Sequence, residues 1–125
     1  MGWFFTRGAT RRDVIDELLR EGTSDAGTFC RALRHCLRGN VMYVLHESGP
    51  REGVRRWVGV YLLDREKDYG WGYKPMDESV GPLYYNCPVS YLDEADEPVN
   101  ETAARWRAEV RRLAARRREL RRGTR

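Results

Sequence analysis

The chain has 125 residues, of which 41% are hydrophobic and 34% charged, and this length is typical of one compact domain. No apolar run reaches the length of about 18 residues that a membrane-spanning helix needs. The N-terminus lacks the basic and apolar regions of a signal peptide, and three cysteines are too few for a disulfide framework. We therefore expect a cytoplasmic protein without a membrane partner.

The formal net charge of +4 is unevenly distributed. Residues 105–125 contain ten arginines and two glutamates, a net charge of +8, whereas residues 1–104 carry a net charge of −4. A high genomic G and C content would explain why arginine outnumbers lysine 21 to 2, but it does not explain the clustering. Such asymmetry indicates contact with nucleic acid or with an acidic partner.

The N-terminal third is predicted to contain a short strand or anchored arm over residues 1–7, followed by a helix over 11–21. Thr10 and Asp13 have the spacing of a capping box, and Gly22 is a typical helix stop. One helical face is apolar and consists of Val14, Ile15, Leu18 and Leu19.

The segment Phe29–Leu37 is ambiguous, because its charges recur at helical spacing. However, Gly39 and Asn40 separate it from the strand-like run Val41–Leu45, and this arrangement favours a hairpin. We therefore expect strand, hairpin and strand here. A third, central strand is expected over Val54–Leu63, which is nearly all apolar in its second half.

Residues 64–92 are rich in glycine and proline and are predicted to form mainly a loop. They hold six of the 14 aromatic residues, so we expect this loop to be ordered and packed.

The final segment is predicted to form a helix that begins after a cap at Asn100 and ends at about Arg122. One stripe carries Trp106, Val110, Leu113 and Leu120, and Arg117 interrupts it. We therefore expect the first half of the helix to dock and residues 116–125 to project into solvent.

These elements predict an α+β fold. Its small antiparallel sheet of three to four strands would pack with the N-terminal helix and the long Arg-rich C-terminal helix. Residues 1–110 would form a single α+β domain, and 111–125 a basic helical extension.

The basic helix is the first candidate site. Its arginines would give salt-dependent contacts to phosphates, although cations also suit the C-terminal end of a helix dipole. The candidate partner-binding arginines are Arg111, Arg112, Arg116, Arg117, Arg118, Arg121 and Arg122.

Catalysis has weaker candidates. Asp77 and Glu78 beside Lys74 have the chemistry of an acid–base pair, and Cys87 that of a nucleophile. Adjacent loop carboxylates are more often turn formers or caps, so no catalytic residue is assigned.

No metal site or cofactor is predicted. The possible ligands match no common zinc spacing; they are Cys30, His35, Cys36, His46 and Cys87. If 29–37 is a strand, strict alternation puts Cys30 and Cys36 on one face and His35 on the other. Most aromatics of residues 69–91 are expected in the core, with base stacking as the alternative.

The central segment of the chain resembles a known family. The residues that carry the resemblance are Gly70-Trp-Gly-Tyr-Lys-Pro-Met-Asp-Glu-Ser-Val-Gly-Pro82, Tyr84-Tyr85-Asn-Cys-Pro88 and Tyr91-Leu92-Asp93. They are similar to an uncharacterised family of small proteins from phages, plasmids and other bacterial mobile elements, and the resemblance spans most of residues 1–110.

The resemblance implies a genetic neighbourhood rather than a reaction. Small accessory proteins of such elements often inhibit host defence, as anti-CRISPR and anti-restriction proteins do. We therefore expect a non-enzymatic protein that binds a host nucleoprotein or nucleic acid through the basic helix and through Trp71, Tyr73 and Lys74. The alternatives are a small enzyme that uses Asp77, Glu78 and Cys87, and a self-assembling module whose aromatic loop forms the interface.

Overall fold

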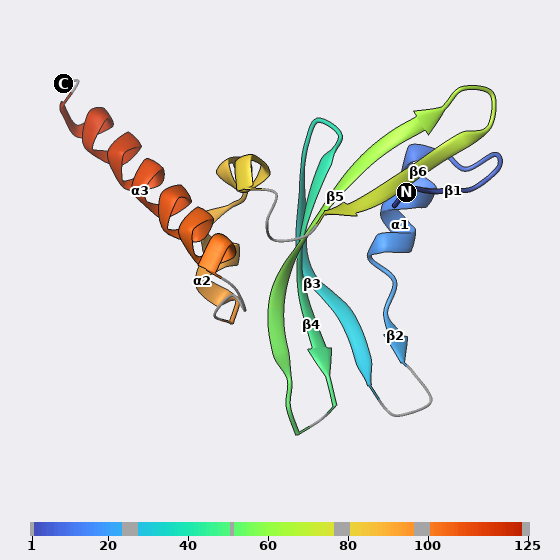
Figure 1. Cartoon of the computed structure of the whole chain (residues 1–125), viewed down its shortest axis with the longest axis horizontal. Helices are drawn as coiled ribbons and strands as arrows, with labels where there is room; N and C mark the ends of the chain where they lie inside the picture. Colours follow the sequence, from blue (N-terminus) through green and yellow to red (C-terminus); the bar gives the residue numbers. More distant parts are fainter. Residues whose placement is uncertain (1, 24–27, 51, 77–80, 97–100, 124–125) are drawn as a thin grey trace. The chain divides into compact units, whose positions relative to one another are not determined.

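The computed structural model describes residues 2–23, 28–50, 52–76, 81–96 and 101–123 (Figure 1). The chain divides into two compact units, Met1–Asp77 and Glu78–Arg125. The elements of the first unit are β1 (Phe4–Phe5), α1 (Arg11–Leu18), β2 (Gly22–Thr23), β3 (Phe29–Arg38), β4 (Val41–Gly49), β5 (Arg55–Glu66) and β6 (Gly70–Met76). Those of the second unit are the 3-10 helix η1 (Gly81–Asn86), α2 (Val89–Glu94) and α3 (Glu101–Gly123).

The first unit is built on an antiparallel sheet with the strand order β1-β6-β5-β4-β3-β2. The predicted hairpin is confirmed: Arg38 pairs with Val41, and Gly39 has a φ of 64°, a left-handed conformation that glycine adopts without strain. The predicted central strand is confirmed as β5, which lies between β4 and β6.

The sheet is larger than the three to four strands predicted. Six strands are present among the described residues, because β1 and β2 add two-residue pairings at the two edges and β6 adds a full strand. The expectation of a loop over 64–92 was wrong for most of the described residues. β5 extends to Glu66, β6 spans Gly70–Met76, and η1 and α2 follow over Gly81–Asn86 and Val89–Glu94.

The glycines of β6 serve close packing rather than a loop. A Cβ on Gly72 would lie 2.3 Å from the carbonyl oxygen of Phe4, and one on Gly70 would lie 2.2 Å from that of Thr6. Glycine at these two positions therefore lets the N-terminal chain approach β6 and form β1.

The N-terminal helix covers one face of the sheet, beside β5 and β6 (Figure 1). Its capping box is confirmed, because Thr10 accepts a hydrogen bond from the Asp13 backbone and the Asp13 side chain accepts one from Thr10. Val14 and Ile15 are buried and pack with a cluster of sheet residues, namely Met42, Val44, Tyr61 and Leu63.

The helix is shorter than the predicted 11–21. It ends at Leu18, because Gly22 belongs to β2, where it pairs with Cys30, and the intervening residues carry the chain to that strand.

β2 pairs with only the first two residues of β3, Phe29 and Cys30. Among the described residues, no strand pairs with the outer side of β3 from Arg31 to Arg38.

The second unit is helical. α3 packs against η1 and α2, and its contact with η1 is close because a Cβ on Gly81 would lie 1.5 Å from the Trp106 ring. The guanidinium of buried Arg107 donates hydrogen bonds to the carbonyl oxygens of Ala95 and Asp96, at 3.4 and 2.8 Å. These bonds satisfy backbone groups at the end of α2.

The predicted division at residues 110/111 falls inside α3, which is one continuous helix, and the predicted cap Asn100 lies outside the described residues. Among the described helices, none has the length and apolar character needed to cross a membrane.

Candidate functional site

The first half of α3 is amphipathic, as predicted. Ala103 and Val110 are buried, and Trp106 and Leu113 are partly buried. These side chains recur at intervals of three and four residues, which places them along one face of the helix.

The second half of α3 has no apolar face. Every residue from 116 to 123 is exposed, and Leu120 has a relative accessibility of 58%. At helical spacing, the stripe that holds Val110 continues through Arg117 and Arg121. The helix therefore extends beyond its packed part with arginine where a packed helix would carry apolar residues.

Two arginines at the beginning of the basic stretch are held by carboxylates. Arg111 donates to Asp93 with an Nη2–Oδ1 distance of 2.7 Å. Arg112 forms a bidentate pair with Glu109, which lowers the pKa of that carboxyl. The positive charges of Arg111 and Arg112 are therefore partly neutralised by carboxylates of the same unit.

The remaining arginines are differently placed. In the part of the chain that the structure describes, no carboxylate pairs with Arg116, Arg117, Arg118 or Arg122. A guanidinium is always charged and offers a planar set of donors that matches phosphate. These four side chains thus provide a cationic surface that is open to an anionic partner.

A groove opens beside the first half of α3. Tyr85, Arg105, Trp106 and Glu109 line it, and its volume is about 330 Å³. The ring of Tyr85 meets that of Trp106 edge to face, with centroids 5.4 Å apart. Tyr85 has a relative accessibility of 36%, so aromatic surface is available in the groove.

The other predicted partner-binding residues lie on β6. Trp71 and Tyr73 are partly buried and pack against the cluster under α1, and Lys74 is partly buried near Gly2. The structure gives the two aromatic residues a packing role, and their binding role stays a prediction.

Of the weak catalytic candidates, only Cys87 lies among the residues that the structure describes. Asp77 and Glu78 lie outside the described residues. Cys87 is buried, with a relative accessibility of 5%, and its thiol donates a hydrogen bond of 3.6 Å to the Pro88 carbonyl oxygen. A buried thiol is poorly placed to meet a substrate.

A buried polar cluster joins three strands of the first unit. Nε2 of His46 lies 2.7 Å from the Tyr61 hydroxyl, and Nδ1 lies 3.8 Å from Sγ of Cys30. The His46 ring also stacks on Trp57, whose Nε1 donates to the Ser48 hydroxyl. Cys30 and His46 were candidates from the sequence, whereas Tyr61 was not, because only the strand register brings these residues together.

Burial favours the neutral forms of the groups in this cluster. Burial lowers the pKa of His46 to about 4, and burial also raises the pKa of the Cys30 thiol and of the Tyr61 hydroxyl. A nucleophilic cysteine needs the opposite shift, toward thiolate. The arrangement is therefore a hydrogen-bonded core network.

The predicted faces of β3 were wrong. A bulge between Ala32 and Arg34 breaks the alternation, so that Cys30 and His35 share one face while Cys36 lies on the other. Among the described residues, no cluster of potential ligands is arranged to hold a metal ion.

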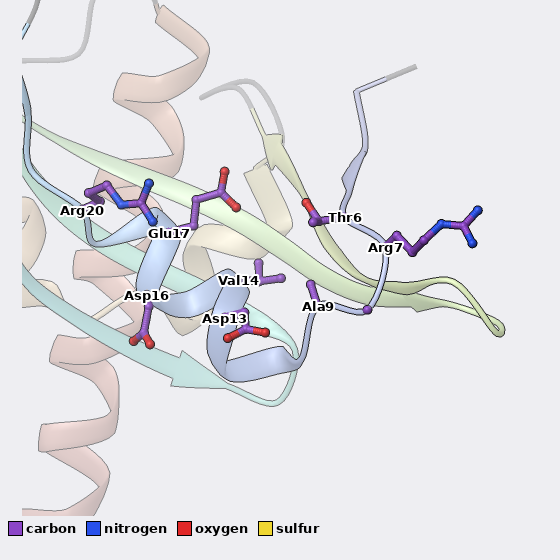
Figure 2. Close-up of a pocket in the computed structure, with 9 residues that line it drawn as sticks. Thr6, Arg7, Ala9, Asp13, Val14, Asp16, Glu17 and Arg20 are labelled. Atoms are coloured by element: carbon purple, nitrogen blue, oxygen red, sulfur yellow. The ribbon is translucent and has the colours of Figure 1, made fainter.

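A further groove lies between α1 and the chain that precedes it, and acidic residues line it (Figure 2). Asp13 caps the helix, Asp16 pairs with Arg12 at 3.1 Å, and Glu17 points away from both (Figure 2). Because these carboxylates do not converge, the groove lacks the geometry of a cation site.

Comparison with known proteins adds no candidate: no family model, curated protein or solved structure matches this chain.

Proposed function

We propose that this protein is a non-enzymatic binding protein whose α3 contacts the phosphates of a nucleic acid, free or within a host nucleoprotein. The observation that carries the proposal is the exposed second half of α3, where Arg116, Arg117, Arg118 and Arg122 have no carboxylate partner among the described residues.

The distribution of charge supports a phosphate partner. From residue 111 to 123 the helix carries seven arginines and one glutamate, over a length of about 18 Å. The helix dipole accounts for cations only in the last turn, whereas these arginines occupy more than three turns and several sides of the helix. Their planar guanidinium groups suit phosphate oxygens.

The biological setting that we propose follows from the resemblance of residues 70–93 to mobile-element proteins. In that setting, binding would occupy a host nucleoprotein or its nucleic acid, as an inhibitor of host defence does. The proposal does not depend on Asp77, Glu78 or Cys87.

The test measures nucleic-acid affinity as a function of salt concentration. Replacing Arg116, Arg117, Arg118 and Arg122 by glutamine should weaken binding and reduce the slope of log K against log salt by as much as about 3, since each lost phosphate contact removes about 0.7 to 0.9.

The matched control removes the same charge from the first unit. It replaces four exposed arginines by glutamine, namely Arg7, Arg20, Arg38 and Arg65. If the two variants lose affinity and slope equally, the helix has no special role and the proposal is wrong.

A further inference from the structure

We propose that the groove between Tyr85 and Trp106 binds an unpaired nucleobase, so that the nucleic acid held by α3 is single-stranded. This inference rests on the proposed function and specifies the class of partner.

The groove offers a fixed aromatic surface. Trp106 is held because its ring lies directly over Gly81, where even a Cβ would clash. Tyr85 meets this ring edge to face, with an interplanar angle of 70°, and remains partly exposed. A preorganised pair with exposed ring surface is suited to stacking, which any base can make through its π face.

The groove also adjoins a stripe of cations. Arg105 lines it, and Arg112 and Arg116 follow on the same face of α3, seven and eleven residues further along the chain. This stripe extends about 16 Å from Arg105. A strand with one base in the groove would thus have its backbone beside guanidinium groups, the combination found in single-strand binding sites.

Glu109 makes the groove selective for bases over phosphates. Its carboxylate lines the groove and is kept ionised by the bidentate Arg112, which lowers its pKa. A carboxylate repels a phosphate but accepts hydrogen bonds from the amino groups on base edges. In a duplex, the base faces are stacked and the pairing edges are occupied, so a duplex cannot use this groove.

The experiment measures fluorescence anisotropy of three labelled DNAs with the full chain. They are a short single strand, the same strand annealed to its complement, and a strand of equal length made of abasic sites. The variant Tyr85→Ala is compared with Tyr69→Ala. Tyr69 is a matched control because it is similarly exposed, at 40%, and also lies beside an arginine, Arg7.

We expect Tyr85→Ala to weaken binding of the single strand by about 10-fold or more, the usual loss when one stacking ring is removed. Duplex and abasic binding should change by less than about 2-fold, because phosphate contacts do not involve the ring. Tyr85→Phe should restore single-strand affinity, since the ring is retained, and this distinguishes stacking from a folding defect.

Equal affinity for the normal and abasic strands, or equal losses in Tyr85→Ala and Tyr69→Ala, would overturn the inference while leaving phosphate binding by α3 intact. Failure of all three DNAs to bind would overturn the proposed function as well.

Discussion

Nε2 of His46 on β4 lies 2.7 Å from the hydroxyl oxygen of Tyr61 on β5, and both side chains are buried. They occupy the sheet face that α1 covers, where Tyr61 belongs to the main cluster of the core. A neutral imidazole has one donor and one acceptor nitrogen, so the His46 ring can hydrogen-bond Tyr61 without carrying a charge. Because protonation would charge the buried ring, His46 is a pH-sensitive group inside the core of the first unit.

The first prediction concerns stability at acidic pH. The pKa of His46 falls from 6.5 to about 4 because the ring is buried. Between these values the unfolded chain binds a proton that the folded chain does not. The free energy of unfolding should therefore decrease as the pH falls from 6.5 to 4, by up to about 3 kcal/mol from this group.

Urea denaturation across this pH range measures the effect, with His46→Gln and His35→Gln compared with the unmodified protein. The His46 variant should show a flatter dependence on pH, whereas the variant of exposed His35 should follow the parent. Parallel pH profiles for the parent and His46→Gln would contradict the prediction.

The second prediction concerns the hydroxyl of Tyr61. Tyr61→Phe removes the partner of Nε2 and leaves a buried polar nitrogen unsatisfied, at a cost of about 1 to 3 kcal/mol. Tyr73→Phe is the control, because the Tyr73 hydroxyl makes no hydrogen bond among the described residues and its ring packs on the same cluster. Similar urea midpoints for the two variants would show that the hydrogen bond contributes little.

The third prediction concerns Gly59. A Cβ at this position would lie 2.6 Å from the Tyr61 hydroxyl oxygen and 2.7 Å from Cε2 of the ring. Gly59→Ala should displace the ring and destabilise the unit by about 1 to 3 kcal/mol. NMR titration should also show the pKa of His46 moving back toward its ordinary value.

Gly22→Ala is the matched control for that change, since a Cβ there meets nothing within 4 Å. An unchanged His46 titration in Gly59→Ala would mean that the Tyr61 ring does not depend on this glycine.

The fourth prediction concerns the second unit. Arg107→Met keeps the apolar length of the side chain but removes the donors to the carbonyl oxygens of Ala95 and Asp96. We expect a loss of about 1 to 3 kcal/mol and faster hydrogen exchange in α2. Arg118→Met, at an exposed position of the same helix, should leave exchange unchanged. Equal exchange rates in the two variants would remove the proposed role of Arg107.

Local signals made parts of the fold predictable. The Gly39-Asn40 turn and the Thr10 capping box each act over a few residues, and both were confirmed. The periodicity around Val110 likewise predicted which half of α3 packs and which half is exposed.

Signals that depend on distant chain segments were missed. Gly70 and Gly72 indicated a loop because their role, close approach of β1, involves a segment more than sixty residues away in sequence. The bulge after Ala32 depends on pairing with β4, and it reversed the faces of the residues that follow. The exposed arginines of the candidate site were visible in the sequence, whereas the groove beside them depends on how η1 packs on α3.

Among the described residues, no strand pairs with the outer side of β3 from Arg31 to Arg38, and this edge has a consequence for solubility. A strand at the edge of a sheet can recruit a strand from another molecule and so start aggregation. Here arginine occurs at the first, fourth and last residues of the stretch Arg31–Arg38, so two copies meeting edge to edge would bring like charges together. These arginines have the spacing that made the segment resemble a helix. They thus also oppose the association of two copies of the chain through β3.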